Sequence, residues 1–130
     1  MPGITLTLAP DLLTRHPDLL VAGFRAAKLR TAAAACGDVT PVFEAARAAL
    51  GEAGVTLQNL VEQPQIAAWR KAIGACGLRP SRYRSSAEQL ARRVLKTGTV
   101  STPLPLVTLY CAVSAHHLAP LGAYDVTRLP

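Results

Sequence analysis

Three prolines stand near the start of apolar segments long enough to form a helix, and they constrain the fold of this chain most. Pro41 follows Thr40, Pro103 follows Thr102, and Pro64 opens the segment between them. A proline suits the first helical turn because its missing N–H has no partner there, and a threonine before it can cap the helix. We therefore expect helices to begin at Thr40-Pro41, at Pro64 and at Thr102-Pro103.

A fourth segment with helical spacing of apolar residues lies between the second and third of these helices. Ser85 and Ser86 precede Glu88 and Gln89 at the spacing of a capping box, so this helix is expected to begin there. Glycines, which adopt left-handed backbone conformations, and a histidine pair are expected to end the helices. The expected ends are Gly54, Gly77, Gly98 and His116-His117. The last helix is apolar around nearly its whole circumference, which predicts an interior position.

Strands are expected in three other places. Residues 4–8 alternate apolar and polar side chains, and residues 18–29 place Leu20 and Phe24 on one face, although their alanines also allow a helix. Residues 121–126 form the third candidate. The predicted fold is α/β (α+β), a single domain over residues 1–130 with a small mixed sheet of about three strands packed with about four helices. Open sheet edges would favour a homo-oligomer or a completing partner chain.

Composition and local motifs exclude several classes of protein. With 50% hydrophobic and 17% charged residues the chain is not expected to be disordered, and it has no apolar run of transmembrane length. Its first residues lack the pattern of a secretory signal, and its three cysteines show no CxxC spacing, so we expect a cytoplasmic protein with reduced thiols and no metal or cofactor. No phosphate-binding glycine loop and no G-x-S-x-G motif is present, and the residues alone assign no catalytic group.

Positive charge is concentrated in one part of the sequence. The chain has a net charge of +6, and the segment from Gln65 to Val100 holds eight Lys and Arg residues and only one acidic residue, Glu88. Arginine binds phosphate oxygens through two parallel hydrogen bonds, so this segment could bind an RNA backbone. The alternative is a solvated helix face and a loop held by Glu88. The candidate RNA-binding residues are Arg79, Arg82, Arg84, Arg92, Arg93 and Lys96.

The second half of the sequence resembles a known family. The matching segments are Trp69-Arg70, Gly77-Leu78-Arg79-Pro80, Tyr83 to Glu88, Leu90 to Val94, Leu106 to Ser114 and Pro120 to Asp125. They are similar to the freestanding relatives of the B3/B4 domain, the tRNA-binding and editing domain of the phenylalanyl-tRNA synthetase beta chain. The resemblance covers only the N-terminal half of that domain, because members continue with further strands beyond the position of Asp125.

The resemblance implies an α/β domain that binds tRNA or aminoacyl-tRNA, and an editing pocket that hydrolyses mischarged aminoacyl-tRNA. Editing requires a pocket that accepts a phenolic hydroxyl through hydrogen bonds. Thr108 and Cys111 stand where the family usually has aspartate and asparagine, and Gly122 stands where the synthetase has histidine. The candidate pocket residues are Ser86, Glu88, Thr108, Cys111, Gly122, Tyr124 and Asp125.

Three functions therefore remain open at the level of sequence. The first is a tRNA- or aminoacyl-tRNA-binding protein that could act as an aminoacyl-tRNA deacylase, alone or once completed by a partner chain. The second is a non-catalytic RNA- or protein-interaction module. The third is a binder of a small amino-acid derivative on the same scaffold. Salt-sensitive tRNA binding would favour either of the first two, because phosphate contacts release counterions.

Overall fold

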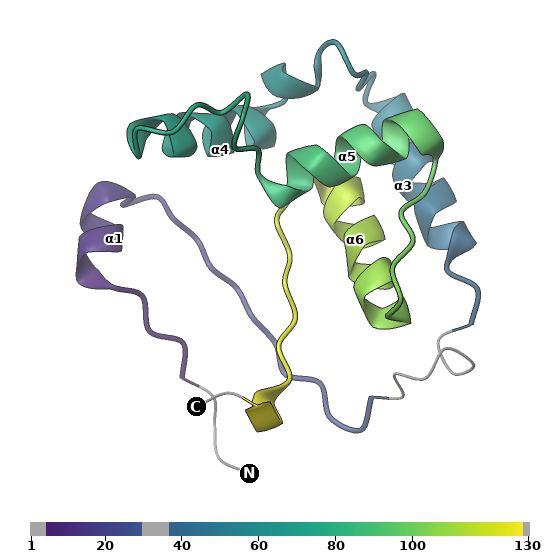
Figure 1. Ribbon diagram of the computed structural model, residues 1–130, viewed down its shortest axis with the longest axis horizontal. Coiled ribbons are helices and arrows are strands. Elements are labelled where there is room, and N and C mark those ends of the chain that lie inside the picture. Colours follow the sequence, from purple (N-terminus) through teal and green to yellow (C-terminus); the bar gives the residue numbers. More distant parts are fainter. Residues whose placement is uncertain (1–4, 30–36, 129–130) are drawn as a thin grey trace.

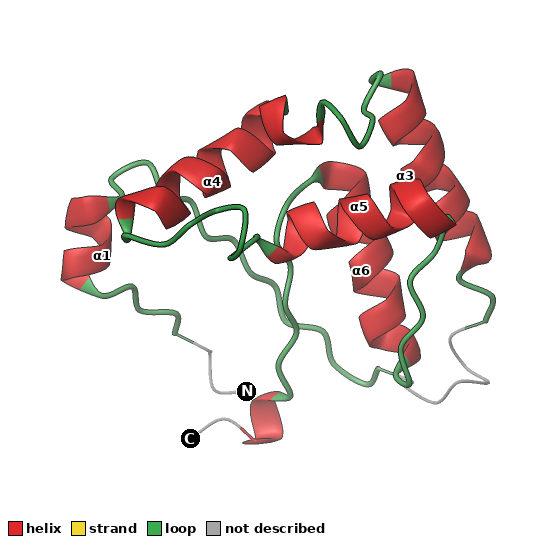
Figure 2. Ribbon diagram, turned by 45° about the horizontal axis from the view of Figure 1, so that its top comes forward, coloured by secondary structure: helices red, strands yellow, loops and turns green. Residues whose placement is uncertain are grey.

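All regular structure in the described residues, 5–29 and 37–128 of this computed structural model, is helical (Figures 1 and 2). The α-helices are α1 (Pro10–Arg15), α3 (Thr40–Glu52), α4 (Pro64–Ala75), α5 (Ser86–Thr97) and α6 (Pro105–His117). Two short 3-10 turns are η1 (Leu60–Glu62) and η2 (Val126–Arg128). No helix in these residues has both the length and the apolar character needed to cross a bilayer.

The core lies where α3, α5 and α6 meet. α6 packs against α3 and α5, and α5 also contacts α3, which Figure 2 shows as a group of three neighbouring helices. Phe43 and Leu50 lie two turns apart on the same face of α3, and both are 2% exposed. They pack with fully buried alanines and a valine, whose small side chains allow the helices to approach closely. These are Ala87, Ala91 and Val94 of α5 and Ala112 and Ala115 of α6.

Local signals place the helix ends well, with two corrections. Ser85 caps α5 as expected, because its Oγ accepts a hydrogen bond from the N–H of Glu88 at 3.2 Å, and Gly98 ends it with a φ of 79°. α3 begins at Thr40, which was expected to cap it. The N–H of Thr40 donates to Oδ1 of Asp38 at 2.9 Å, so the side chain that accepts at this helix start is Asp38. The α6 helix begins at Pro105 instead of Thr102-Pro103.

The expected three-stranded sheet is wrong for the described residues, which contain no strand. Residues 5–9 and 16–29 have no regular secondary structure, residues 10–15 form α1, and residues 121–128 end in η2. Leu20 is 88% exposed and Phe24 is 96% exposed, so no second layer covers the alternating face. A strand needs a neighbouring strand to pair with as well as the right pattern, and the described residues provide no such strand. The predicted strand residue Ile4 lies outside the described residues.

The interior position expected for the whole circumference of α6 is also wrong. Its buried residues are mostly small or polar, whereas Leu104, just before the helix, is 61% exposed and Leu109 is 37% exposed. The hydroxyl groups of the two buried polar residues have partners. The Oγ1 atoms of Thr108 and Thr102 bond each other at 2.9 Å, and Oγ of Ser114 donates to the carbonyl of Ala119 at 2.6 Å. Packing against α3 and α5 therefore selects one face of a helix that is apolar on several.

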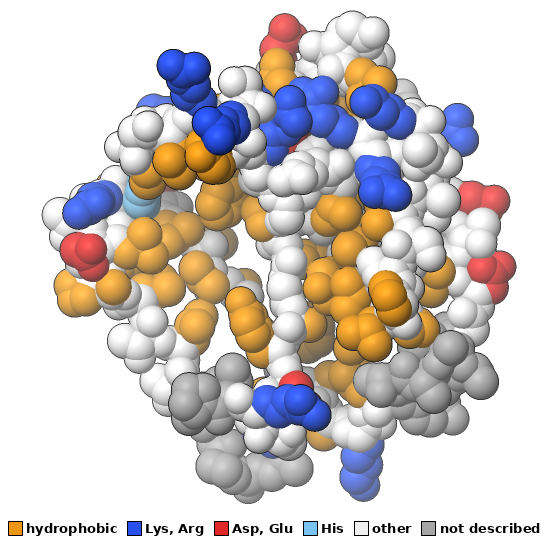
Figure 3. Space-filling model, viewed as in Figure 1, with side chains coloured by type: hydrophobic (Ala, Val, Ile, Leu, Met, Phe, Trp, Pro, Cys, Tyr) orange, Lys and Arg blue, Asp and Glu red, His pale blue; other side chains and the backbone are white. Residues whose placement is uncertain are grey.

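α4 and the N-terminal arm lie at the periphery of this core. α4 packs on η1 and inserts the fully buried Ile66 into the core cluster. The arm, residues 5–29, carries α1, which Figure 1 places away from α3, α5 and α6. Lys and Arg side chains gather over α4 and α5 in Figure 3, and apolar side chains cover much of the surface below them.

Candidate functional site

The most unusual side chain of the described structure is Glu88, a carboxylate that is 0% exposed. Nη1 of Arg70 donates to both of its oxygens, at 3.1 and 3.0 Å, and Nε of Arg92 donates to Oε1 at 3.1 Å. Nε of Arg84 forms an ion pair with the same Oε1 at 3.4 Å. A buried carboxylate is tolerated only when cations or hydrogen-bond donors compensate its lost hydration, and here three arginines do so.

Helical geometry explains two of these three contacts. Arg84, Glu88 and Arg92 are spaced four residues apart, so the last two lie one above the other on α5, with Arg84 just before the helix. The third contact is long-range, because Arg70 reaches Glu88 from α4 and also donates to the carbonyl of Pro80 at 3.4 Å. Glu88 therefore connects α4 and the loop over residues 79–84 to the first turn of α5.

A basic groove with a volume of about 370 Å³ lies beside this cluster. We call this hollow the basic groove. It is lined by Arg84, Gln89, Arg92, Arg93, Lys96 and Thr97. Four of the six are cationic, and Arg93 and Lys96 are exposed to solvent on α5. The side chains of Arg84 and Arg92 are 42% and 27% exposed, so both remain partly accessible to solvent. The groove can accept an anionic group.

Four of the six candidate RNA-binding residues thus line one groove, and two lie outside it. Arg79 and Arg82 are exposed in the loop before α5, where the guanidinium carbon of Arg82 lies 5.5 Å from the centre of the Tyr83 ring. Arg70 and Gln89 were not among the sequence candidates. The spacing of residues 84, 88 and 92 is a signal that could have grouped the two groove arginines with Glu88, whereas no local pattern indicates Arg70.

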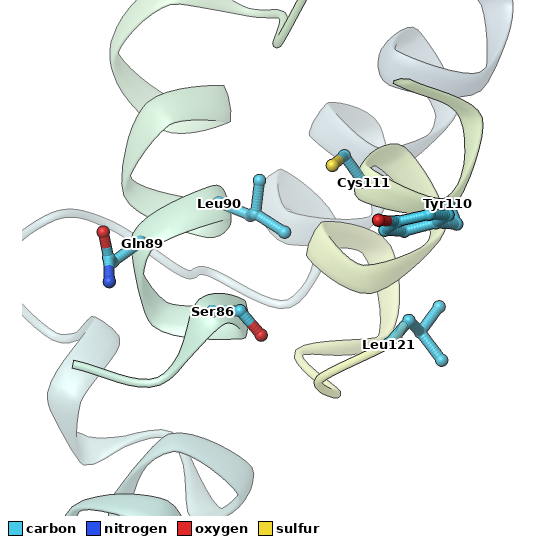
Figure 4. Close-up of a pocket in the computed structure, with 6 residues that line it drawn as sticks. All are labelled: Ser86, Gln89, Leu90, Tyr110, Cys111 and Leu121. Atoms are coloured by element: carbon cyan, nitrogen blue, oxygen red, sulfur yellow. The ribbon is translucent and has the colours of Figure 1, made fainter. Parts of the chain in front are cut away.

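A second hollow, of about 290 Å³, lies between α5 and α6 (Figure 4). It is lined by Ser86, Gln89, Leu90, Tyr110, Cys111 and Leu121. Its surface is mainly apolar, with hydroxyl groups from Ser86 and Tyr110. Gln89 belongs to both hollows, so the basic groove and this apolar pocket adjoin at one residue of α5.

The structure brings only Ser86 and Cys111 of the seven candidate pocket residues into this pocket. Glu88 serves the arginine cluster, and Thr108 is buried against Thr102. The remaining candidates, Gly122, Tyr124 and Asp125, are exposed on the segment after α6. There the Thr127 side chain and N–H donate to Asp125, and these bonds lower its pKa.

The pocket shows no arrangement for nucleophilic chemistry among the described residues. Burial raises the pKa of Cys111, so its sulfur stays a neutral thiol, which is a poor nucleophile. The ring centroids of His116 and His117 lie 4.6 Å apart with the rings tilted by 49°, and neither residue lines either hollow. Within the described ranges, no three His, Cys, Asp or Glu side chains come close enough to hold a metal ion.

Comparisons of this chain with protein-family models, with curated proteins and with solved structures find no match.

Proposed function

We propose that this chain binds the phosphate backbone of structured RNA through the basic groove. The observation that carries the proposal is the grouping of four cationic side chains, from Arg84 to Lys96, around one groove on α5. A groove lined by positive charges attracts a polyanion, and binding gains free energy from the counterions that the phosphates release. Arg79 and Arg82 extend the positive surface from the groove onto the adjoining loop.

Backbone binding fits this groove better than reading of single-stranded bases. Base stacking needs exposed aromatic side chains along the binding path, and the groove lining contains none. Aromatic residues make up only 5% of the sequence, and Tyr83, in the loop, is 47% exposed. The proposed contacts are therefore to phosphate oxygens and would not depend on base sequence.

The resemblance of residues 69–129 to the B3/B4 editing domain supports tRNA as the RNA in question, and the cytoplasm as its place of action. Binding, without hydrolysis, is the activity proposed here. Five of the seven residues that the resemblance assigned to an editing pocket lie outside the pocket between α5 and α6, and the thiol of Cys111 is neutral. A protein partner is proposed only for the arm, where Leu20 and Phe24 are exposed. Sedimentation velocity over a range of protein concentrations tests whether that partner is a second copy of the chain.

The test is a filter-binding titration with bulk tRNA at several salt concentrations. The variant Arg93→Ala/Lys96→Ala removes two groove cations that lie on the exposed face of α5. The matched control Arg15→Ala/Lys28→Ala removes the same charge from exposed positions of the N-terminal arm. We expect the groove variant to lower affinity about ten-fold at low salt and to reduce the slope of log K against log salt by about two.

The control should lower affinity by less than about three-fold and leave the slope unchanged, because it alters only the long-range field. Equal losses in the two variants would show that binding follows net charge and would exclude the groove as the site. Absence of binding by the wild-type chain at low salt would overturn the proposed function altogether.

A further inference from the structure

We infer that Glu88 is a positioning residue for the phosphate site, an inference that rests on the proposed function. A carboxylate beside a groove that should bind anions would ordinarily weaken binding, because it repels phosphate. Glu88, however, is fully buried, and two of its three partners, Arg84 and Arg92, are lining residues of the basic groove. Its negative charge acts on the arginines from behind the groove.

The atoms through which Glu88 holds these arginines leave the rest of each guanidinium group available. Both arginines approach the carboxylate most closely with Nε, at 3.1 Å for Arg92 and 3.4 Å for Arg84. No described residue accepts a hydrogen bond from the Nη atoms of either side chain. A guanidinium group has five N–H donors, so Nε can serve Glu88 while the two Nη atoms bind phosphate oxygens side by side.

Holding the side chains in place reduces the entropy lost on binding. A free arginine has many rotamers, and fixing it in one of them at an interface costs conformational entropy. The contacts with Glu88 restrict Arg84 and Arg92 before the ligand arrives. Arg93 and Lys96 line the same groove and form no ion pair with Glu88, so they serve as internal controls for charge without this restriction.

Arg70 completes the arrangement from outside the groove. It binds both oxygens of Glu88 and is not one of the lining residues. Three arginines and one carboxylate leave the cluster with a net positive charge, so Glu88 orders the groove without reversing its sign. The ligand expected at Arg84 and Arg92 is a phosphodiester group of the RNA, bound by the Nη atoms.

Charge and positioning predict different results when arginine is replaced by lysine. Lysine keeps the charge but has a single ammonium group, which cannot bind Glu88 through one nitrogen and a phosphate through two others. Arg92→Lys should therefore weaken tRNA binding about five-fold, whereas Arg93→Lys, which loses no contact with Glu88, should weaken it only about two-fold. Glu88→Gln should also weaken binding about three-fold or more, although it adds one unit of positive net charge. Glu52→Gln, an exposed change on α3, adds the same charge and should leave affinity equal or slightly higher.

The experiment measures tRNA affinity of the full chain for these four variants at low salt and at a temperature where circular dichroism shows each to be folded. The exchange of the arginine Nε–H groups, followed by NMR of the free protein, provides a second measurement. Slow exchange at Arg84 and Arg92, with fast exchange at Arg93, is expected, and Glu88→Gln should remove the difference. Arg92→Lys needs no large rearrangement, so it tests the inference even if Glu88→Gln unfolds.

The outcomes separate the inference from the function on which it rests. Wild-type binding with equal effects of Arg92→Lys and Arg93→Lys, or with tighter binding by folded Glu88→Gln, would overturn the positioning role and leave RNA binding intact. No wild-type binding would overturn both. Unequal lysine effects together with protected Nε–H groups would establish Glu88 as the residue that orders the groove.

Discussion

Replacement of Glu88 by glutamine should destabilise the protein strongly and should affect α4 before the rest of the fold. The carboxylate is the only described acidic side chain that is fully buried, and three arginines surround it. Glutamine keeps one acceptor oxygen but turns an NH2 group toward guanidinium N–H groups. The change therefore removes charge-assisted hydrogen bonds and creates a buried donor without an acceptor.

The expected loss follows from the contacts. A hydrogen bond to a charged group contributes about 1.5 to 3 kcal/mol, and a buried unsatisfied donor costs about 1 to 3 kcal/mol. The arginine side chains are 25% to 42% exposed, so water replaces part of what they lose. We expect the free energy of unfolding to fall by about 3 kcal/mol, which is a large share of the 5 to 15 kcal/mol typical of a domain.

Urea unfolding followed by two probes measures both the size and the location of this effect. Far-ultraviolet circular dichroism reports all helices, whereas Trp69, the single tryptophan, lies in α4 beside Arg70. Because α4 is anchored by Arg70 and by its packing on η1, the fluorescence transition of Glu88→Gln should occur at lower urea than the dichroism transition. Arg70→Met should lose about 1 to 2 kcal/mol alone and add little in the double variant, because the two residues act together.

Glu52→Gln is the control, since this exposed glutamate should change the free energy of unfolding by no more than about 0.5 kcal/mol. The reasoning would be refuted if Glu88→Gln matched that control and its two transitions coincided. Such a result would mean that the buried carboxylate contributes no net stability, as happens when desolvation cancels the attraction of its partners.

Four further predictions concern α5, α6 and the two described cysteines. Ser114→Ala removes the donor to the Ala119 carbonyl and should cost about 1 to 2 kcal/mol in urea unfolding. Exposed Cys76 should react with iodoacetamide much faster than buried Cys111, as peptide mapping would show. Burial raises the pKa of Cys111 in the folded protein. The neutral thiol therefore contributes its full stability below the pKa of the unfolded chain, and this contribution is lost as pH rises through the folded pKa. Cys111→Ala should flatten the resulting alkaline decline in the free energy of unfolding. Gly98→Ala should cost about 1 kcal/mol by thermal unfolding, because the φ of 79° is unfavourable for alanine.

The parts of the fold that depend on neighbouring residues could be predicted from the sequence. Ser85 and Gly98 locate α5 to within one residue, and Pro64 marks the first residue of α4. The predicted start of α6 is early by two residues, because Thr102 bonds Thr108 and Leu104 instead of capping a helix that includes Pro103. A short capping motif can be satisfied by several local geometries, and tertiary packing selects one of them.

The sequence could predict which cationic residues of the candidate site lie together, but it could not predict which residues line the pocket between α5 and α6. Arg84, Arg92, Arg93 and Lys96 are close in sequence, so one helix and the residue before it bring them together. The pocket candidates come from α5, α6 and the segment after α6, and their relative positions depend on how these elements pack. Leu90 and Tyr110 line the pocket although no polar motif marked them, since a hollow is defined by the surfaces that meet there.

The sequence by itself determined the helical segments and the concentration of positive charge, because both depend on residues within a few turns of one another. The tertiary structure decided what required distant partners. It left residues 18–29 without a neighbouring strand despite their alternating pattern, and it exposed Leu109 on a helix that is apolar on several faces. It also buried Glu88 by bringing Arg70 from 18 residues away, a contact that no local spacing encodes.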